Sequence, residues 1–423
     1  MANPEMASVP LEGWSHSAAI RKQADVHVVT QVRNKAAMER AGWVHGTDFT
    51  ALDTEAVAKP IWALSNKLRG GSGVGWTTAT AVGIPSYYYF EHLFWKMFGA
   101  RIRAKEWDIV HRLTPLSPTY PSIIGGKCKR AGVPFVVGPI NGGVPWPTGF
   151  DNVRRAEKEW LSYVRDAYKL LPGYAATRRH AAAVGIGSID TWKQFADVHK
   201  HKAIYIPENA IDPARFPEPQ PRDAATLPLR IAFIGRLVPY KGADMLLEAC
   251  APLVREGKCE VDVLGDGPEM PKLKEIVARE NLGDRVRLHG WVKHTELHGH
   301  LSQADIFGFP SIREFGGAVV LEAMAMGLVP VVVAYGGPNE LVTDSTGYRV
   351  PIGPRATLIE SFRAILSEIA DDPSGLRTMA ERARERVLKH FTWDAKAAQV
   401  VGMYAWAAGD VKEKPDFGMP LPD

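Results

Sequence analysis

The front half of the chain alternates short runs of β-branched and apolar residues with longer stretches of helical pattern. Each run ends near a Gly or Pro, which is typical of buried strands bounded by turns. The strands predicted in this way cover Val26–Thr30, Asp108–His111, Pro134–Gly138, Ala182–Gly187 and Ala203–Pro207. Strands separated by helices favour a parallel sheet with helices on both faces.

The back half repeats this alternation with a stronger helical periodicity. Its predicted strands cover Leu229–Gly235, Cys259–Gly265, Arg285–Gly290, Asp305–Pro310 and Val329–Ala334. The predicted fold class is therefore α/β, with two Rossmann-like doubly wound domains in tandem. Because ligands bind beyond the carboxyl ends of the strands in such sheets, we expect the two domains to face a cleft.

Proline marks the boundary between the two halves. The prolines of this stretch are Pro207, Pro213, Pro217, Pro219, Pro221 and Pro228. Proline at this density excludes a helix or a central strand, so residues 207–228 are the predicted linker. It separates an N-terminal domain, 1–206, from a C-terminal domain, 229–392. A last helix, 393–409, is expected to pack back on the first domain, and the tail, 410–423, is expected to be disordered.

The start of the chain breaks this pattern. A doubly wound domain should open with a strand, yet Met1–Gly13 has the composition of a loop. We therefore expect the sheet of the first domain to lack its first strand in this chain.

Composition is that of a globular enzyme, with 46% hydrophobic and 23% charged residues. Three cysteines form neither a disulfide framework nor a zinc-binding spacing, which favours a reducing, cytoplasmic compartment. No signal-peptide pattern is found at the N-terminus. The most apolar run, Val319–Gly337, contains Glu322 and Pro330, so it is better explained by a buried helix and strand than by a membrane span.

Charge is distributed unevenly along the chain. Residues 1–210 hold 26 Lys and Arg against 17 Asp and Glu, a net charge of +9, and the remainder holds 25 against 30, a net charge of −5. A basic front half suits an anionic acceptor or a peripheral contact with the inner membrane face, and it is also explained by solvated surface charge. No nucleic-acid-binding motif is present, so nucleic acid is not an expected partner.

The first candidate chemistry follows the first strand of the back half. Gly235 ends that strand, Arg236 stands at its carboxyl end, and Lys241 comes five residues later. Two fixed cations at the mouth of a sheet can neutralise a diphosphate, Arg as a bidentate donor and Lys as a point charge. Taken alone, this loop is also explained as a surface turn with two basic residues.

A second segment, Glu-Phe-Gly-Gly-Ala-Val-Val-Leu-Glu at Glu314–Glu322, follows the predicted strand Asp305–Pro310. Gly316 and Gly317 allow a ligand to approach the first N–H groups of the next helix, where an anion is favoured. Glu322 lies in an apolar helix, and a buried carboxylate needs a bonded partner. That partner is either a pair of ligand hydroxyls or a neighbouring Arg or backbone group.

Together these two segments resemble the signature of the family 4 glycosyltransferases, which is Gly-Arg-Leu-x-x-x-Lys-Gly followed by Glu-x7-Glu. Further segments that resemble motifs of this family are Ile206–Asp212, Val263–Glu269, Leu288–Val292 and Ala334–Glu340. The resemblance covers Ile204–Trp393 well and the front half only in outline. It implies two Rossmann-like domains, the GT-B fold.

The resemblance also implies roles for the matching residues. Glu322 would bond the ribose hydroxyls of a nucleotide, Glu314 would bond the donor sugar, and Gly290 and Trp291 would lie near the base. The groups that would surround the diphosphate belong to Arg236, Lys241, Phe315, Gly316 and Gly317. The family retains the anomeric configuration and needs neither a metal nor another cofactor. Cationic groups would stabilise the charge on the departing diphosphate.

The front half departs from the family pattern. Many members carry a His at the end of the strand that here reads Pro134–Gly143 without one, so Asn141 or the backbone of Gly142–Gly143 is the expected contact to the donor sugar. His111 ends another front strand and is either a site residue or a structural one. The glycine-rich first loop of the family is replaced by Ser8–Trp14.

The predicted function is transfer of a hexose from a nucleotide diphosphate sugar, with UDP as the expected nucleotide, to a hydroxyl acceptor in glycolipid, polysaccharide or glycoside biosynthesis. The acceptor is expected on the front domain. There, Phe90–Trp107 interleaves aromatic and basic residues, as either a core helix or an interfacial helix near a membrane. The alternatives are an epimerase or α-glucan synthase of the same fold, and a non-catalytic nucleotide-sugar-binding module.

Overall fold

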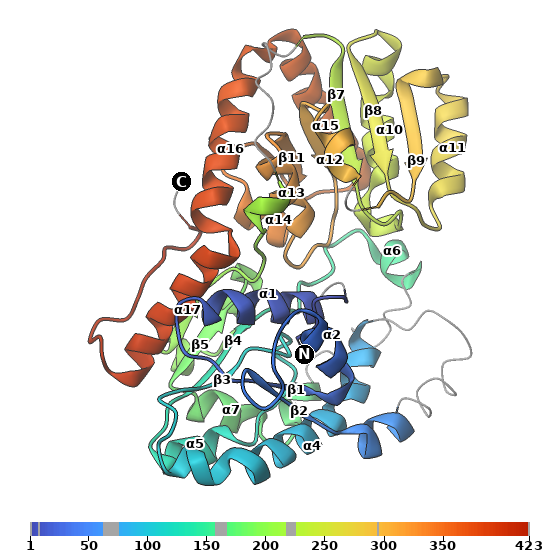
Figure 1. Ribbon diagram of the computed structural model, residues 1–423. Helices are drawn as coiled ribbons and strands as arrows, with labels where there is room; N and C mark the ends of the chain where they lie inside the picture. The colour runs from blue at the N-terminus through green and yellow to red at the C-terminus, as the bar shows by residue number, and fades with distance from the viewer. Residues whose placement is uncertain are drawn as a thin grey trace. The chain divides into compact units, whose positions relative to one another are not determined.

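The computed structural model describes residues 2–6, 9–61, 76–156, 167–216, 226–293 and 296–421 (Figure 1). Contacts divide the chain into two compact units. Unit 1 comprises Met1–Gly143, Glu157–Glu208 and Trp393–Met419, and unit 2 comprises Val144–Ala156, Asn209–Thr392 and Pro420–Asp423. Of the linker prolines, Pro217, Pro219 and Pro221 lie outside the described residues.

Unit 1 contains parallel strands in two separate sheets. β1 (Val28–Gln31) pairs with β2 (Phe49–Leu52), and a four-stranded sheet has the order β3-β4-β5-β6. The strands of the larger sheet are Val110–Arg112, Phe135–Ile140, Ala183–Ile186 and Ala203–Tyr205. All five strands predicted for the front half are confirmed. β2 was not predicted, because its sequence Phe-Thr-Ala-Leu contains a single β-branched residue and does not indicate a strand.

One helix of unit 1 begins within the segment Met1–Gly13, which was predicted to be a loop. Val9–Gly13 is not loop, because α1 begins at Val9, with Pro10 and Glu12 in the first turn, where both residue types are tolerated. The helices are α1 (Val9–Arg21), α2 (Lys35–Arg40), α4 (Trp76–Arg103), α5 (Gly125–Ala131), α7 (Tyr174–His180), α8 (Ile189–Gln194), α9 (Asp197–Lys200) and α17 (Trp393–Ala408). Two 3₁₀ turns, η1 (Val32–Asn34) and η3 (Ala167–Leu170), complete the set.

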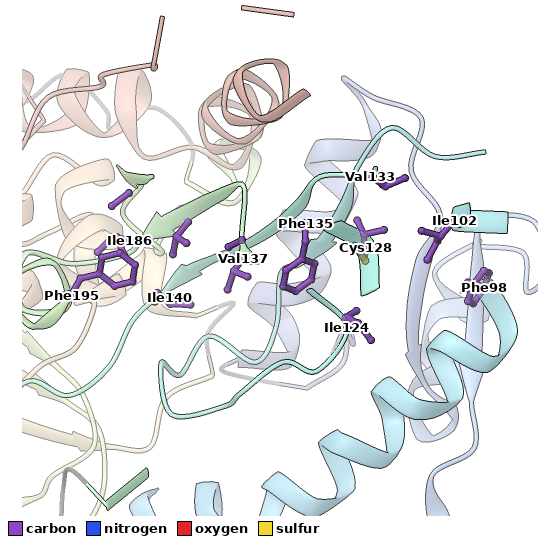
Figure 2. Close-up of a cluster of buried hydrophobic side chains, with 14 residues drawn as sticks. Phe98, Ile102, Ile124, Cys128, Val133, Phe135, Val137, Ile140, Ile186 and Phe195 are labelled. Carbon is purple, nitrogen blue, oxygen red and sulfur yellow. The ribbon is translucent and has the colours of Figure 1, made fainter. Parts of the chain in front are cut away.

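Helices cover both faces of the four-stranded sheet. Successive side chains of a strand point to opposite faces, so Phe135 and Val137 of β4 join one layer and Val136 joins the other. The first layer contains Phe98 of α4, as well as α5 and β5 residues (Figure 2). The second layer contains residues of α1 and α17, among them Met403. Burial of every residue of β4 on both faces explains its continuous apolar sequence.

The C-terminal tail is described up to Leu421 and makes defined contacts, contrary to the expected disorder. In unit 1, Lys414 Nζ donates a hydrogen bond of 2.9 Å to the Ala203 carbonyl, and Phe417 packs against the layer of α1 and α17. In unit 2, the Leu421 carbonyl accepts a hydrogen bond of 2.9 Å from Arg386. Composition alone misses such order, because the partners lie far away in the sequence.

Unit 2 contains a single six-stranded parallel sheet with the order β12-β11-β10-β7-β8-β9. Its strands are β7 (Leu229–Ile234), β8 (Cys259–Leu264), β9 (Val286–Gly290), β10 (Ile306–Phe309), β11 (Val329–Val333) and β12 (Tyr348–Val350). The five strands predicted for the back half are confirmed. β12, an edge strand, was not predicted, because two of its three residues are partly exposed and its sequence contains a single β-branched residue.

Several helices of unit 2 contact this sheet directly, and the others complete the unit. The helices of unit 2 are α6 (Asp151–Ala156), α10 (Ala243–Arg255), α11 (Met270–Arg279), α12 (Leu297–Leu301), α13 (Ala318–Ala325), α14 (Gly337–Leu341), α15 (Arg355–Asp371) and α16 (Leu376–His390). Short 3₁₀ turns are η4 (Pro213–Arg215), η5 (Pro239–Lys241), η6 (Gly283–Arg285) and η7 (Pro373–Gly375). Residues 144–156, with α6, group with this unit although the predicted domain boundary places them in the first. The sequence gives no signal of this, because the contacts that hold the segment are long-range.

The segment Phe90–Trp107 belongs to α4 as far as Arg103, where this helix ends. α4 is a core helix. Phe98 and Ile102 are buried in the layer shown in Figure 2, and Phe94 and Trp95 pack against that layer. Among the described helices, none is long and apolar enough to cross a bilayer. All three cysteines are free and buried.

Candidate functional site

The sheet of unit 2 reverses its strand order between β7 and β10. From β7 the chain moves outward through β8 and β9, and β10, β11 and β12 then extend on the other side. The strands are parallel, so the carboxyl ends of β7 and β10 are neighbours. Ligands of doubly wound sheets bind at such a reversal, outside the carboxyl ends of the strands. Both segments singled out in the sequence begin at this place.

The loop after β7 carries the two predicted cations. Gly235 directly follows the strand, Arg236 is exposed, and Lys241 ends η5 with a partly buried side chain. The next residue, Gly242, has a φ of +74°, and a Cβ placed there would lie 2.5 Å from the carbonyl oxygen of Pro310. Glycine is therefore needed here, because it lets the loop after β7 touch the loop after β10.

Hydrogen bonds hold these two loops together. The Tyr240 carbonyl accepts from the Ile312 N–H at 2.9 Å and from the Ser311 hydroxyl at 3.3 Å. Ser311 and Ile312 are fully buried. The loop that follows β10 is thus anchored to η5 before it reaches its polar residues.

Lys241 and Glu314 form an ion pair across these loops, and the Lys241 ammonium donates a hydrogen bond to the Glu314 carboxylate. Their side chains are 15% and 19% exposed, so the pair is partly shielded from water. The Lys241 ammonium also lies 5.1 Å from the centre of the Phe309 ring, within cation–π range. The structure therefore brings together Lys241, which was predicted to bind the diphosphate, and Glu314, which was predicted to bind the donor sugar.

The helix after the second loop presents its amino end beside this pair. Gly317, with a φ of +73°, is the residue before α13, and Phe315 and Gly316 are partly exposed next to it. The first N–H groups of a helix lack partners within the helix and favour an anion. Glu322 lies in the second turn of α13 and is half-buried.

Two further glycines bring α14 against the Glu314 loop. The Gly337 N–H donates a hydrogen bond of 3.0 Å to the Glu314 carbonyl. Gly336 has a φ of +61°, and a Cβ on it would lie 2.3 Å from that same carbonyl oxygen. A Cβ on Gly337 would lie 2.6 Å from the Phe315 carbonyl oxygen. In the sequence this loop is visible only as a segment that resembles a family motif. In the structure, the loop contacts the backbone of Glu314 and Phe315 and holds it in place.

Arg313 and Trp146 are residues of this region that the sequence analysis misses. The Arg313 guanidinium lies 4.6 Å from the centre of the Trp146 ring and 5.0 Å from that of Phe315, within cation–π range. Its Nε donates a hydrogen bond of 3.4 Å to the Val144 carbonyl, and the Tyr335 hydroxyl donates one of 3.0 Å to the Pro145 carbonyl. No local pattern could link residues so far apart in the chain.

The predicted base-binding residues follow a different strand. Gly290 ends β9, with a φ of +71°, and its carbonyl accepts a hydrogen bond of 2.8 Å from the Gly265 N–H. Trp291 is 71% exposed. Since β8 separates β9 from β7, these residues are further along the sheet edge than the ion pair, and their role stays a prediction.

The two predicted site residues of the front half, Asn141 and His111, lie in unit 1. The buried Asn141 side-chain carbonyl accepts hydrogen bonds from Ser188 at 2.6 Å and from Thr191 at 3.2 Å. Both ring nitrogens of His111 have protein partners, the Gly138 carbonyl at 2.5 Å and the Tyr404 hydroxyl at 2.6 Å. Burial lowers the pKa of His111 to about 4. These contacts favour a structural role for His111, and the catalytic role of either residue stays a prediction.

Possible metal ligands were also compared with the structure. Across the residues that the structure describes, no three His, Cys, Asp or Glu side chains gather in a way that would hold a metal ion.

The sequence of this region was compared with known families. The sequence model of the family described as "Glycosyl transferases group 1" matches residues 218–386, which contain the whole sheet of unit 2 and the Lys241–Glu314 pair. Residues 218–386 of the chain therefore resemble the glycosyl transferases group 1 family. This finding confirms the family resemblance that the motifs indicated.

Curated relatives also match part of this chain. It is 31% identical over 176 residues to an alpha-D-kanosaminyltransferase of Streptomyces kanamyceticus, a match that covers 41% of this chain and 45% of the relative. It is 34% identical over 210 residues to a D-inositol 3-phosphate glycosyltransferase of Kineococcus radiotolerans, covering 45% and 46%. The chain thus spans about half the length of the curated relatives that it matches.

Solved structures extend the similarity in fold to nearly the whole chain. A sucrose-phosphate synthase of Thermosynechococcus elongatus aligns with a TM-score of 0.60 and 18% identity over 96% of this chain and 94% of its own. The HepE protein of Anabaena in complex with UDP-glucose aligns with a TM-score of 0.55 and 16% identity over 95% and 96%. At this identity the similarity shows the fold alone, and that fold is GT-B, as predicted.

Proposed function

We propose that the protein is a retaining glycosyltransferase that moves a hexose from a nucleotide diphosphate sugar to a hydroxyl acceptor. The observation that carries this proposal is the Lys241–Glu314 ion pair at the strand-order reversal of unit 2. It places a cation and a hydrogen-bond acceptor for hydroxyls beside the amino end of α13, where an anion is favoured. A diphosphate bonded to a sugar presents this combination of charge and hydroxyl groups.

The donor would be bound by the residues around this pair. Lys241, the exposed Arg236 and the backbone N–H groups of Phe315–Gly317 would bind the diphosphate. Glu314 would then accept hydrogen bonds from the sugar, and Glu322 from the ribose hydroxyls. Gly290 and Trp291 are the proposed contacts of the base.

In the proposed reaction, the bond from the anomeric carbon to the diphosphate oxygen breaks and a bond to the acceptor oxygen forms on the same face of the sugar. The proton of the acceptor hydroxyl passes to an oxygen of the departing phosphate. Lys241 and Arg236 stabilise the negative charge that develops there, which is electrostatic catalysis. No protein nucleophile, metal or other cofactor takes part in this scheme.

UDP is the proposed nucleotide, and the HepE structure with UDP-glucose supports it as a protein of the same fold. The proposed acceptor is a hydroxyl of a glycan, lipid or small molecule that unit 1 binds. Relatives named for colanic acid and amylovoran biosynthesis support polysaccharide synthesis as one setting. Three free, buried cysteines fit the proposed cytoplasmic location.

A donor panel tests the nucleotide and the class of reaction. The purified protein is incubated with UDP-, GDP- and ADP-sugars, and release of the nucleoside diphosphate is measured with and without candidate acceptors. We expect turnover of a UDP-sugar, with an α-linked product from an α-linked donor by NMR. An inverted product would contradict the retaining mechanism, and conversion of one sugar nucleotide into another would identify an epimerase.

Site variants test whether the reaction takes place at the proposed donor site. Lys241→Ala and Glu322→Ala are each expected to lower donor turnover about 100-fold or more, the usual effect of removing a group that stabilises the transition state or positions the donor. Matched controls are Lys274→Ala and Glu275→Ala, two exposed residues of α11. Near-normal turnover in both site variants would refute the assignment. Tight nucleotide binding without turnover in the unmodified protein would instead support a binding module.

Membrane contact is tested separately by co-sedimentation with liposomes. Because α4 packs its apolar residues into the core of unit 1, we expect no binding to neutral liposomes. Binding that appears only with anionic lipids and disappears at high salt would support a contact through the basic front half.

A further inference from the structure

Three neighbouring helices of unit 1 expose charges of one sign. α4 contacts α5 and α5 contacts α7, so the three form one continuous surface, which we call the basic face (Figure 1). Glu91 is the single acidic residue in the sequences of these helices, and its side chain is buried. The exposed cations of the basic face are Lys96, Arg101, Arg103, Lys129, Arg130 and Arg179.

Cations of α4 and α5 meet over one aromatic side chain. The Arg103 guanidinium lies 5.8 Å from the centre of the Trp95 ring, and the Lys127 ammonium lies 5.3 Å from it. Both distances are within cation–π range. Trp95 itself is half-buried and packs against the core layer that contains Phe98. The indole therefore holds two cations from different helices close together, although like charges repel.

Cations of α5 and α7 are also close together. Gly126 leaves room between these helices, because a Cβ there would lie 2.8 Å from the His180 ring nitrogen Nδ1 and 3.7 Å from Arg130 Nη1. Burial, followed by repulsion from nearby cations, lowers the pKa of His180. The cations that repel it belong to Arg179, Lys129, Arg130 and Lys202. The positive charge of the basic face therefore extends from α4 across α5 to α7.

Carboxylates neutralise little of this charge. Arg101 forms an ion pair of 2.6 Å with Glu106, which follows α4. For the other exposed cations of the basic face, no ion pair with a carboxylate is found among the described residues. The last turn of a helix favours cations, which explains their positions but not the absence of carboxylates around them. Like charges without partners repel one another and lower the stability of the folded chain, so the basic face suits a partner of opposite charge.

A bilayer that contains acidic lipids matches the basic face in charge, extent and chemistry. α4 has 28 residues, so the face is about 42 Å long, which suits an extended partner rather than a single small anion. The face also includes Met97, whose exposed fraction is 53%, and Trp95 lies beneath two of its cations. Tryptophan beside lysine and arginine is typical of the bilayer interface. Because no described helix can cross a bilayer, such a contact is peripheral.

We propose that the basic face docks on the surface of a bilayer that contains acidic phospholipids. Its Lys and Arg side chains bind the lipid phosphates, and Met97 and Trp95 lie at the level of the headgroups. In a doubly wound unit the helices run alongside the strands, so the carboxyl edge of the four-stranded sheet then lies about one helix diameter, roughly 10 Å, from the membrane. Unit 1 thereby holds its acceptor side close to hydroxyl groups at the bilayer surface, a consequence that rests on the proposed function, whereas the docking itself does not.

Vesicle binding by the full chain tests the proposal. Co-sedimentation is measured with vesicles of phosphatidylcholine alone and of phosphatidylcholine mixed with phosphatidylglycerol. We expect binding to the mixed vesicles at low salt, a steep loss of this binding at high salt, and no binding to phosphatidylcholine alone. Amide hydrogen exchange should slow in α5 and α7 and stay unchanged in unit 2. Absence of binding to the mixed vesicles, or of protection in both helices, would overturn the proposal.

A charge variant identifies the surface that binds. Removal of three cations, by Lys129→Gln, Arg130→Gln and Arg179→Gln combined, should weaken binding to the mixed vesicles about 100-fold, because each cation near an acidic bilayer strengthens binding about fivefold. The variant should fold normally, since it removes like charges that repel one another, and circular dichroism checks this. The exchange experiment on the unmodified chain stands even where the variant does not fold.

The matched control removes the same charge from unit 2. It combines Lys274→Gln, Arg285→Gln and Arg382→Gln, three exposed residues, and should bind nearly as tightly as the unmodified protein. Equal weakening in both variants would show that net charge alone drives binding and would overturn the proposal. Tighter binding to a DNA duplex than to the vesicles, at equal phosphate concentration, would assign the face to nucleic acid instead.

Donor turnover is measured independently of vesicle binding. Vesicle binding through the basic face without turnover of any donor would support the docking and refute the proposed function. Turnover without vesicle binding would support the proposed function and refute the docking.

Discussion

Lys241 and Glu314 lie 73 residues apart in the sequence and form an ion pair that joins the loops after β7 and β10. The partial burial of the pair shields it from water, so it should stabilise unit 2 more than a fully exposed pair does. In the proposed function, the same two residues bind the diphosphate and the sugar of the donor. The ion pair therefore fixes the positions of the two loops before a donor binds.

The first prediction concerns the strength of this pair. In a double-mutant cycle of Lys241→Met and Glu314→Gln, we expect a coupling of about 1–2 kcal/mol in the free energy of unfolding, measured by urea denaturation without a donor. The control is the Arg377–Glu381 pair of α16, with side chains 64% exposed, which should couple by only a few tenths of a kcal/mol. Equal coupling in the two cycles would mean that burial adds nothing.

The second prediction concerns the close approach of α14 to the Glu314 loop. Gly336→Ala should lower the free energy of unfolding by about 1–3 kcal/mol and weaken donor binding, because of its positive φ and because its Cβ would overlap the Glu314 carbonyl oxygen. Thermal denaturation and donor titration measure the two effects. Gly375→Ala is the matched control, since its φ is −78° and a Cβ there meets no atom within 4 Å. A stability loss of the same size in the control would refute the steric explanation.

The third prediction concerns Trp146. Trp146→Ala removes the aromatic face beneath the Arg313 guanidinium and should raise the KM for the donor several-fold, because Arg313 directly precedes Glu314. Trp146→Phe keeps an aromatic face and should restore most of the affinity. Steady-state kinetics with the best donor of the panel provide the measurement. A Phe variant as weak as the Ala variant would indicate that the indole acts by another contact.

The fourth prediction concerns the pH dependence that His111 contributes. Burial lowers its pKa to about 4, below the value of about 6.5 in an unfolded chain. As the pH falls from 6.5 to 4, the unfolded chain takes up a proton that the folded chain does not, so His111 favours unfolding in this window. The effect is absent above pH 6.5 and levels off below pH 4.

His111→Gln removes this contribution together with the smaller effect of His111 on the pKa of His16, whereas other groups such as Glu91, with its raised pKa, are present in both proteins. Urea denaturation between pH 4 and 7.5 should show the unmodified protein losing about 1–3 kcal/mol more than the variant as the pH falls. Parallel pH profiles would show that His111 titrates normally and is not held neutral by burial.

The sequence was most informative where a pattern is local. The central strands β10 and β11 of unit 2 are continuous apolar runs, and both are buried on both faces, so hydrophobicity alone reveals them. The signature around Lys241 and Glu314 indicated the family resemblance, because glycine, cation and carboxylate spacing along a loop is visible without a structure. The strands β2 and β12 each contain a single β-branched residue, so their sequences do not indicate a strand.

What the sequence by itself determined is therefore the fold class and the family resemblance, and it supplied the residues that are proposed to bind a diphosphate sugar. Only the tertiary structure showed that Lys241 forms an ion pair with Glu314 and that the Arg313 guanidinium lies over the Trp146 ring. It also showed a cavity between β1 and β3. The physical reason is the range of the interactions. Hydrophobic periodicity and turn chemistry act over a few residues, whereas these contacts depend on how parallel strands, far apart in the chain, are ordered in a sheet.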